Sequence, residues 1–283
     1  MGGRAAGLVA MVAALILAMP PGRAAERTEP LELGLLPFAS AGTLFKRFAP
    51  LREYLEERIG IPVRLKTAPD FATFVSRTGE GRYDVVLTAP HFVLLALDTG
   101  RYEVRARYRE PLRAVFLMRS ADRGLRPGGK GCRTVATPPP SAVITLLGKH
   151  QLAREGRGIR PRFRAFDSHN AAVRAVLGGD ACAAVVSVNV WHRIRDQESG
   201  LRVVARTATI PGLGILLRKD LPPALRDRLT RVLVGMRQDP RGRAALRRMA
   251  YPGYRPADAG DFAPVQPFLR QLPEGWRKMR ENR

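Results

Sequence analysis

The feature that most restricts the fold of this 283-residue chain is an alternation of short apolar runs with segments of helical periodicity. The same order of elements occurs twice along the chain. Strand candidates occupy six segments: 31–38, 61–68, 83–89, 133–137, 163–168 and 181–187. Each is followed by a turn signal or by apolar residues at helical spacing. Strands that alternate with helices pair mainly in parallel, so the sequence predicts an α/β protein with two doubly wound units.

Several residues mark the ends of the expected helices. Apolar side chains recur every three or four positions over 44–59, which predicts a helix. Gly60 suits its C-terminal cap, and Pro50 should either kink this helix or mark its first turn. Asp70 is expected to cap a short helix, and Pro90 stands at the first position of the next one.

Two further apolar runs, at 113–119 and 202–218, lie outside the repeated units. They suit strands that cross between two lobes, one in each direction, which is the pattern of a domain inserted into another. We therefore expect lobe one at 31–118 plus 211–279, and lobe two at 119–210. Apolar residues at helical spacing from Leu225 onward predict a helical C-terminal tail.

The N-terminus predicts export. Arg4 precedes a 15-residue apolar stretch over 5–19, and Pro20, Pro21 and Gly22 interrupt it. Cleavage after Ala24 would leave small residues at the −3 and −1 positions, as in a signal peptide over residues 1–24. No later segment approaches 18 uncharged apolar residues. We expect a soluble periplasmic protein after cleavage.

The chain is strongly basic, with 48 Lys and Arg against 25 Asp and Glu and a net charge of +23. Such a balance raises nucleic acid as a partner. However, 42 of these cations are Arg, scattered without a block of like charges, and export removes DNA as a partner. We expect no nucleic-acid partner and a general attraction for anions. A polyanion-binding surface or contact with an anionic membrane stays open.

Cys132 and Cys182 are the two cysteines of an exported chain. A disulfide between them would close a loop of about 50 residues and contribute roughly 4 kcal/mol to stability. Both stand near strand starts, so neighbouring strands would bring their Cα atoms within about 7 Å. The alternative is two unpaired, buried thiols. No CxxC motif supports a redox site.

Five phrases of the sequence occur together in one known family. They are LGLLPF, FAPLREYLEERIGIPVRL, GEGRYDVVLTAPHF, DSHNAAVRAVLGGDACAAVV and DLPPALRDRLTRVLVGMRQDPRGRAALRRM. With them the chain resembles the phosphate/phosphite/phosphonate-binding proteins of ABC importers, the PhnD-like family of type II periplasmic binding proteins. The resemblance implies two lobes, each a mainly parallel sheet flanked by helices, joined by two crossing hinge strands.

The resemblance also implies a function. A monomer without a cofactor would capture a small oxyanion between the lobes and deliver it to an ABC permease in the inner membrane. The alternative is a sensor of the same fold that serves a membrane signalling partner. An enzyme on this scaffold would need a Cys or His nucleophile on a cleft turn, and both cysteines fall at strand starts. We therefore expect no enzymatic activity.

The candidate ligand-binding residues lie on turns that precede helices. In open α/β sheets, ligands bind beyond the carboxyl ends of the strands, where helix N-termini favour anions. The candidates are Ser40, Thr43, Thr88, His91, Ser141, Ser168 and His169. Each hydroxyl could instead be a simple helix cap. Such N-termini can hold a tetrahedral anion without a dedicated arginine.

Two of the four histidines are candidates for ligand contact. His169 matches the family's "s-H" and would donate a charge-assisted hydrogen bond if protonated, although a capping or packing role stays open. His91 is supported by its position alone. His150 and His192 are expected on solvated helix surfaces. Where relatives carry a Ser/Thr-rich phosphate loop, this chain has PPPSAVITLL, so the identity of the anion stays open. No HExxH or Cys/His cluster supports a metal site.

Overall fold

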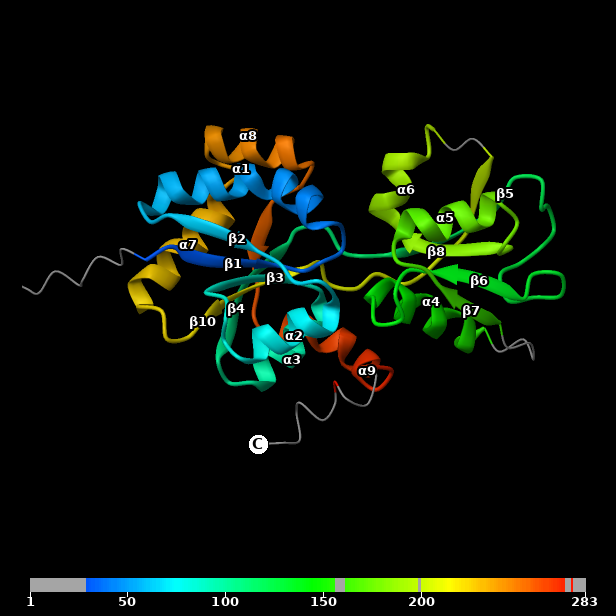
Figure 1. Cartoon of the computed structure of the whole chain (residues 1–283), viewed down its shortest axis with the longest axis horizontal. Helices are drawn as coiled ribbons and strands as arrows, with labels where there is room; N and C mark the ends of the chain where they lie inside the picture. The colour runs from blue at the N-terminus through cyan, green and yellow to red at the C-terminus, as the bar shows by residue number, and fades with distance from the viewer. Residues whose placement is uncertain (1–28, 156–160, 198–199, 273–275, 277–283) are drawn as a thin grey trace, which may run out of the picture.

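The computed structural model describes residues 29–155, 161–197, 200–272 and 276, which form two α/β lobes side by side (Figure 1). The signal peptide expected over 1–24 lies outside the described residues, as does residue 279, the expected end of lobe one. Within the described ranges, no helix is both long and apolar enough to cross a membrane.

The first lobe holds a six-stranded sheet in the order β11-β4-β10-β3-β1-β2. Its strands are β1 (Leu31–Leu35), β2 (Val63–Lys66), β3 (Val85–Thr88), β4 (Tyr102–Tyr108), β10 (Gly214–Arg218) and β11 (Tyr254–Pro256). One face packs on α1 (Ala41–Ile59), α7 (Pro223–Gly235) and α8 (Pro240–Met249). The other packs on α2 (Phe71–Gly79), α3 (Pro90–Asp98), the 3-10 helix η1 (Ala259–Val265) and α9 (Gln266–Leu269).

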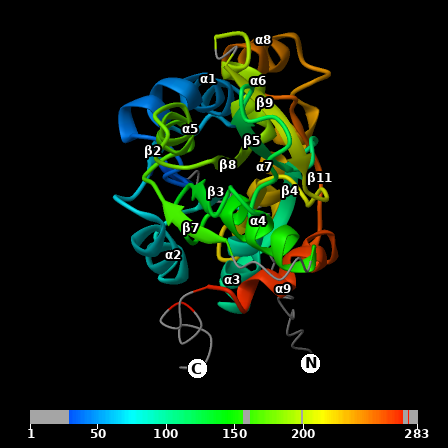
Figure 2. The same cartoon turned by 90° about the vertical axis from the view of Figure 1, so that its right-hand side faces the viewer.

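The second lobe holds a five-stranded sheet in the order β7-β6-β8-β5-β9. Its strands are β5 (Ala114–Arg119), β6 (Thr134–Thr137), β7 (Arg162–Ala165), β8 (Ala183–Ser187) and β9 (Leu201–Arg206). Its helices are α4 (Val143–Arg154), α5 (His169–Leu177) and α6 (Val188–Ile194). Figure 2 views the molecule from this lobe, with α4 on one side of the sheet and α5 and α6 on the other.

The two sheets share one plan, which confirms the expected fold class. Three parallel strands form the part of each sheet next to the helix N-termini: β2-β1-β3 in the first and β7-β6-β8 in the second. Antiparallel strands extend both sheets, so each is mixed. β10, β4 and β11 extend the first, and β5 and β9 extend the second.

Most of the expected helix ends are confirmed. Gly60 caps α1 with a left-handed φ of 67°, a conformation in which a residue without Cβ has no steric penalty. Asp70 caps α2 by accepting a hydrogen bond from the backbone N–H of Thr73. Pro90 opens α3. Pro50 lies inside α1, which begins at Ala41 and so continues on both sides of the proline.

The crossing between the lobes occurs earlier in the chain than the sequence suggested. The boundary expected after Met118 falls inside β5, whose partners β8 and β9 both belong to the second sheet. The chain therefore crosses over 109–113 and returns over 207–213. Leu112 and Ile210 pair there as an isolated antiparallel bridge, with two N–H to O=C hydrogen bonds of 2.9 Å.

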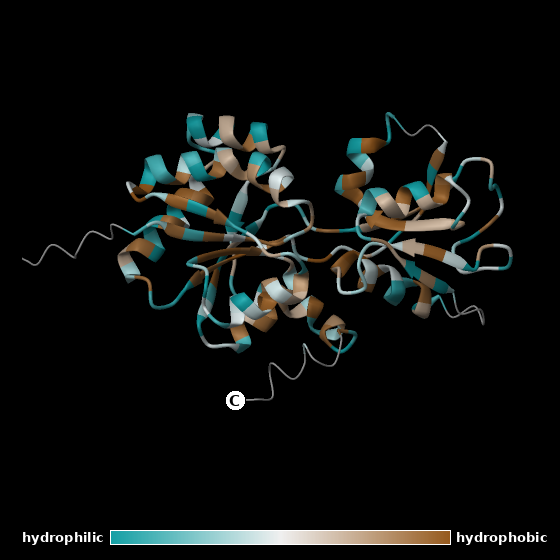
Figure 3. Ribbon diagram, in the orientation of Figure 1, coloured by the Kyte–Doolittle hydropathy of each residue, from teal (hydrophilic) through white to brown (hydrophobic). Residues whose placement is uncertain are grey.

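The lobes also touch beside these crossing segments. One buried apolar cluster includes Phe92 and Val93 of α3 together with Ile144 and Leu147 of α4. The His150 ring of α4 packs edge-on against Phe268 of α9, with ring centroids 5.5 Å apart. Figure 3 shows that apolar residues gather in the strands and on the inner helix faces of each lobe.

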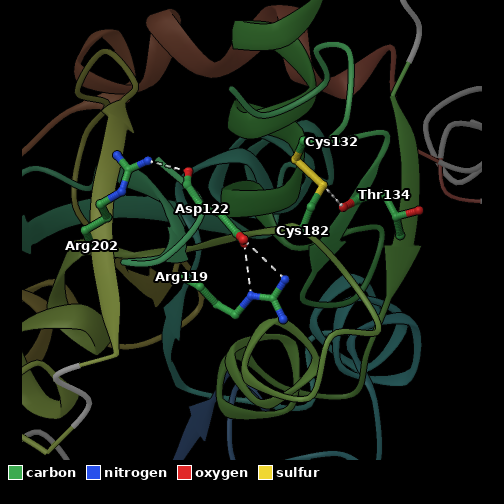
Figure 4. The surroundings of a disulfide bond; sticks show 6 residues. All are labelled: Arg119, Asp122, Cys132, Thr134, Cys182 and Arg202. Atoms are coloured by element: carbon green, nitrogen blue, oxygen red, sulfur yellow. Dashed lines mark hydrogen bonds and ion pairs between the residues drawn. A yellow bond between two sulfur atoms is a disulfide. The ribbon is translucent and has the colours of Figure 1, made fainter. Parts of the chain in front are cut away.

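A disulfide joins Cys132 and Cys182 in the second lobe, as predicted (Figure 4). Their Cα atoms are 5.3 Å apart, because Cys132 precedes β6 and Cys182 precedes β8, which are paired neighbours. Nearby, Asp122 forms an ion pair with Arg119, and its carbonyl accepts a hydrogen bond from Arg202. These contacts hold the long β5–β6 connection against the sheet.

Candidate functional site

A cavity of about 1200 Å³ lies between the lobes, next to the carboxyl ends of the parallel strands. The N-terminal residues of six helices line it. Three of these helices belong to the first lobe, α1, α2 and α3, and three to the second, α4, α5 and α6. The first backbone N–H groups of a helix have no partner within the helix and carry partial positive charge. The cavity is therefore suited to an anion.

The start of α1 contributes two hydroxyls predicted from the sequence. Ser40 caps the helix by accepting from the N–H of Thr43, and the two hydroxyl oxygens lie 2.9 Å apart. Both residues are exposed and line the cavity. Each hydroxyl has further hydrogen-bonding capacity, since it can donate one bond and accept two.

The start of α5 contributes Ser168 and His169, which also line the cavity as the sequence predicted. The Ser168 hydroxyl caps α5 by accepting from the N–H of Ala171 at 3.1 Å. Neighbouring α6 adds Ser187 and Asn189, which the sequence reasoning missed because it assigned no ligand turn after the strand at 181–187. Ser187 caps α6 in the same manner.

His169 is neutral in the folded protein at neutral pH, so the charge-assisted hydrogen bond of a protonated ring is not available there. Burial, with a smaller effect of the Arg193 charge, lowers its pKa to about 4. Its Nδ1 accepts from the backbone N–H of Ser187 at 3.4 Å, so the proton of the neutral ring resides on Nε2. His169 can thus donate one uncharged hydrogen bond through Nε2.

His91 and Ser141 meet across the lobes. His91 is fully buried, and its Nε2 lies 2.9 Å from the carbonyl oxygen of Ser141, which can only accept. The proton is therefore on Nε2, and burial lowers the pKa of His91 to about 4. His91 lines the cavity, whereas Ser141 does not. Ser141 therefore contacts His91 through its backbone carbonyl, and its hydroxyl, which was predicted to meet the ligand, does not line the cavity.

Thr88 does not reach the cavity. It is buried at the end of β3, beside the antiparallel partner Gly214, and does not belong to the cavity lining. The strand alternates side chains between its two faces, so a residue at the strand end can point into the core instead of the cleft. Its neighbours Ala89 and His91 line the cavity in its place.

Two arginines in the cavity wall were not foreseen. Arg47 of α1 and Arg193 of α6 belong to opposite lobes and line the same cavity. Desolvation and the positive charge of Arg47 both lower the pKa of Arg193. Neither forms an ion pair with a carboxylate in the described part of the chain.

Helical spacing could have indicated both arginines. Arg47 follows Thr43 by four positions and Arg193 follows Asn189 by four, so each lies one turn beyond a residue at a helix start. His192 is exposed on α6, as expected for a solvated helix surface, and it also lines the cavity. His150 instead packs on Phe268. Because arginine is abundant along the whole chain, its occurrence at these two positions does not stand out in the sequence.

Aromatic side chains form the apolar part of the wall. Those that line the cavity are Phe38, Phe71, Phe92, Tyr108 and Tyr251. The rings of Tyr108 and Tyr251 have centroids 4.7 Å apart. Among the described residues, no group of three or more His, Cys, Asp or Glu could hold a metal ion. The cavity thus combines cationic and hydrogen-bond-donating groups with an aromatic surface.

Comparison with known proteins agrees with this geometry. A family model described as "ABC transporter, phosphonate, periplasmic substrate-binding protein" matches residues 33–262. The fold is similar to that of a binding protein component of an ABC phosphonate transporter from Pseudomonas aeruginosa, at 14% identity and a TM-score of 0.73. That match covers 89% of this chain and 88% of the other.

Two further solved structures share the fold, and each has a bound ligand. PhnD1 from Prochlorococcus marinus, in complex with methylphosphonate, is 17% identical with a TM-score of 0.73, over 86% of this chain and 97% of that one. A Xanthomonas citri protein bound to ATP is 21% identical with a TM-score of 0.69, over 89% and 98% of the two chains.

Proposed function

This chain belongs to the family of periplasmic substrate-binding proteins of phosphonate ABC transporters, and on that premise we propose that it captures a phosphate-, phosphite- or phosphonate-like oxyanion between its lobes. It then delivers this ligand to an ABC permease in the inner membrane. Members of the family bind substrates and are not enzymes, so the ligand leaves chemically unchanged. The protein is exported by cleavage of residues 1–24 and acts as a monomer.

The observation that supports this proposal most directly is the convergence of six helix N-termini on one cavity. A tetrahedral oxyanion presents several acceptor oxygens in different directions, and N–H groups from both lobes can each reach one of them. We assign ligand contacts to Ser40, Thr43, Ser168 and His169, all of which line the cavity.

Lobe closure follows from the same arrangement. The first lobe supplies α1, α2 and α3, and the second supplies α4, α5 and α6, so a bound anion makes favourable contacts with both. A ligand that binds the closed state more tightly than the open one shifts the population toward closure. The closed form is then the one that the permease receives.

The proposal is tested by a thermal-shift panel of phosphate, phosphite, methylphosphonate, sulfate and acetate, followed by calorimetry. A ligand at 100 times its dissociation constant stabilises the protein by about 2.7 kcal/mol. We expect a phosphorus oxyanion to give the largest shift. His169→Ala should weaken its binding by roughly 2- to 10-fold, the net effect of one uncharged hydrogen bond.

Arg174→Ala is the control, because Arg174 lies on the same helix α5 as His169, is exposed and does not line the cavity. Its affinity should equal that of the parent. A panel in which acetate or sulfate binds and no phosphorus oxyanion does would overturn the proposed ligand class. Equal affinities of His169→Ala and the parent would remove His169 from the contact set.

A further inference from the structure

We propose that Arg47 and Arg193 form a clamp across the cleft that selects an organic ligand with a second anionic group besides its phosphorus oxyanion. The inference rests on the proposed function and names the substrate class of that same cavity. The second group would be a carboxylate, a phosphate or another phosphonate, held between one guanidinium from each lobe.

The position of the two arginines is the first support. Arg47 lies in the second turn of α1, beyond the exposed hydroxyls of Ser40 and Thr43. Arg193 lies near the C-terminal end of the short helix α6, and not at its N-terminus. Both are therefore displaced along their helices from the N–H groups that suit the first oxyanion. Two separate anion subsites can coexist in one cavity.

The electrostatics of the pair are the second support. Arg47 and Arg193 place two like charges in the wall of one cavity, one from each lobe, and like charges repel when the lobes close. Partial desolvation and the charge of Arg47 both lower the pKa of Arg193. An anion placed between the guanidinium groups replaces repulsion with two attractions, and each planar fork can bind a carboxylate or phosphate in bidentate fashion.

The size and surface of the cavity are the third support. Its volume of about 1200 Å³ exceeds the roughly 300–1000 Å³ typical of pockets for drug-sized molecules. A methylphosphonate ion would leave most of this space to water. The aromatic wall formed by Phe71, Phe92, Tyr108 and Tyr251 suits the carbon skeleton that would link the two anionic groups.

The other charged residues of the lining are Lys46, Arg248 and Glu110. Lys46 belongs to α1 of the first lobe and has no counterpart lysine in the second, so it does not form a clamp across the cleft. Arg248 forms an ion pair with Glu53 at 3.1 Å, so its charge is already compensated. Glu110 is an exposed carboxylate in the lining and forms no ion pair with either arginine in the described part of the chain. It would favour a ligand that carries an amine. The charge of the ligand's second group therefore distinguishes binding by the arginine clamp from binding by Glu110.

The experiment compares three ligands that differ only in their terminal group. Propylphosphonate ends in a neutral methyl, 3-aminopropylphosphonate in a cation, and 2-carboxyethylphosphonate in an anion. Calorimetry on the full mature chain should show affinity that decreases from the carboxylate ligand to the methyl ligand to the amine ligand. We expect the carboxylate to bind about 10- to 100-fold more tightly than the methyl ligand, as charge-assisted hydrogen bonds do.

Arg193→Gln and Arg47→Gln test the assignment. Each should reduce the preference for 2-carboxyethylphosphonate over propylphosphonate to about 3-fold or less, while propylphosphonate binds nearly as before. The matched controls are Arg195→Gln at the C-cap of α6 and Arg52→Gln on α1, neither of which lines the cavity. Both should keep the full preference.

The outcomes separate this inference from the proposed function. If the three phosphonates bind equally, or the amine ligand binds most tightly, the clamp is overturned and the proposed function stands. Equal losses for all three ligands in Arg193→Gln would also overturn it. Glutarate carries two carboxylates and butyrate only one. If glutarate binds more tightly than butyrate while no phosphonate binds, the clamp stands and the proposed phosphorus ligand is overturned. A protein that binds none of these anions overturns both.

Discussion

At the scale of single residues, His91 shows how the fold changes the chemistry of a side chain. The ring is fully buried between the lobes and donates to the carbonyl of Ser141. Its Nδ1 has no hydrogen-bond partner in the described residues. Because nothing there compensates a positive charge, the neutral ring is favoured. A histidine in this setting acts as a fixed hydrogen-bond donor between lobes.

This environment predicts that acid destabilises the protein through His91. Its pKa is about 4 when folded and about 6.5 when unfolded, so the unfolded chain binds the proton first as pH falls. Stability from this residue is present above pH 6.5 and is lost toward pH 4, by up to about 3 kcal/mol. Urea unfolding across pH 4 to 7.5 measures the loss.

His91→Gln is the informative variant for that measurement. The glutamine amide can donate to the Ser141 carbonyl and does not titrate, so its unfolding free energy should depend less steeply on pH. Identical pH dependence in parent and variant would show that His91 is not responsible. The pKa of His169 is lowered as well, so His169 contributes to the pH dependence of stability that remains in the His91→Gln variant.

At the scale of elements, the disulfide ties together the two strands that present α4 and α6. Cys132 precedes β6 and Cys182 precedes β8, and these strands pair in parallel. Each strand leads directly into a helix whose N-terminus lines the cavity. The bridge therefore restrains the opposite end of the strands that carry the second lobe's half of the site.

The double variant Cys132→Ala/Cys182→Ala should lose about 4 kcal/mol of unfolding free energy, because a loop with a sequence separation of 50 becomes free in the unfolded chain. Urea denaturation at pH 7 measures this loss. Hydrogen exchange should place the faster opening in β6 and β8, with the first lobe unchanged. A loss below about 1 kcal/mol would contradict the prediction.

At the scale of the whole molecule, two crossing segments connect the lobes, and Gly212 lies where they pack most closely. A Cβ at this position would come within 2.5 Å of the Glu110 carbonyl oxygen and 2.7 Å of the Tyr108 Cβ. Both of those residues belong to the end of β4 or the first crossing, and both line the cavity. The absence of a side chain at Gly212 lets the two segments approach.

Gly212→Ala should therefore separate the crossing segments and disturb both lobes. We expect a loss of about 1–3 kcal/mol in unfolding free energy, as for other substitutions that overpack a closed site. Binding of the phosphorus oxyanion should weaken as well. Gly235→Ala is the control, because nothing lies within 4 Å of its Cβ position and it stands on α7. Equal stability of the two variants would refute the role of Gly212.

The sequence by itself determined the parallel strands of both lobes, most of the helices, and their order. Periodicity identified these elements, and the single residues Gly60, Asp70 and Pro90 indicated helix ends because local backbone chemistry decides them. The cysteine pair followed from two neighbouring strand starts. The hydroxyls of Ser40, Thr43 and Ser168 were found because helix starts after parallel strands are visible in a sequence.

Only the tertiary structure decided which side chains meet. In β4, buried apolar residues alternate with half-buried charged ones, which is typical of a strand, but only the structure shows its partners β10 and β11. The pairing of His91 with Ser141, and the presence of Arg47 and Arg193 in one cavity wall, bring together residues about 50 and 146 positions apart. Such contacts depend on how two lobes pack, and local periodicity carries no information about that packing.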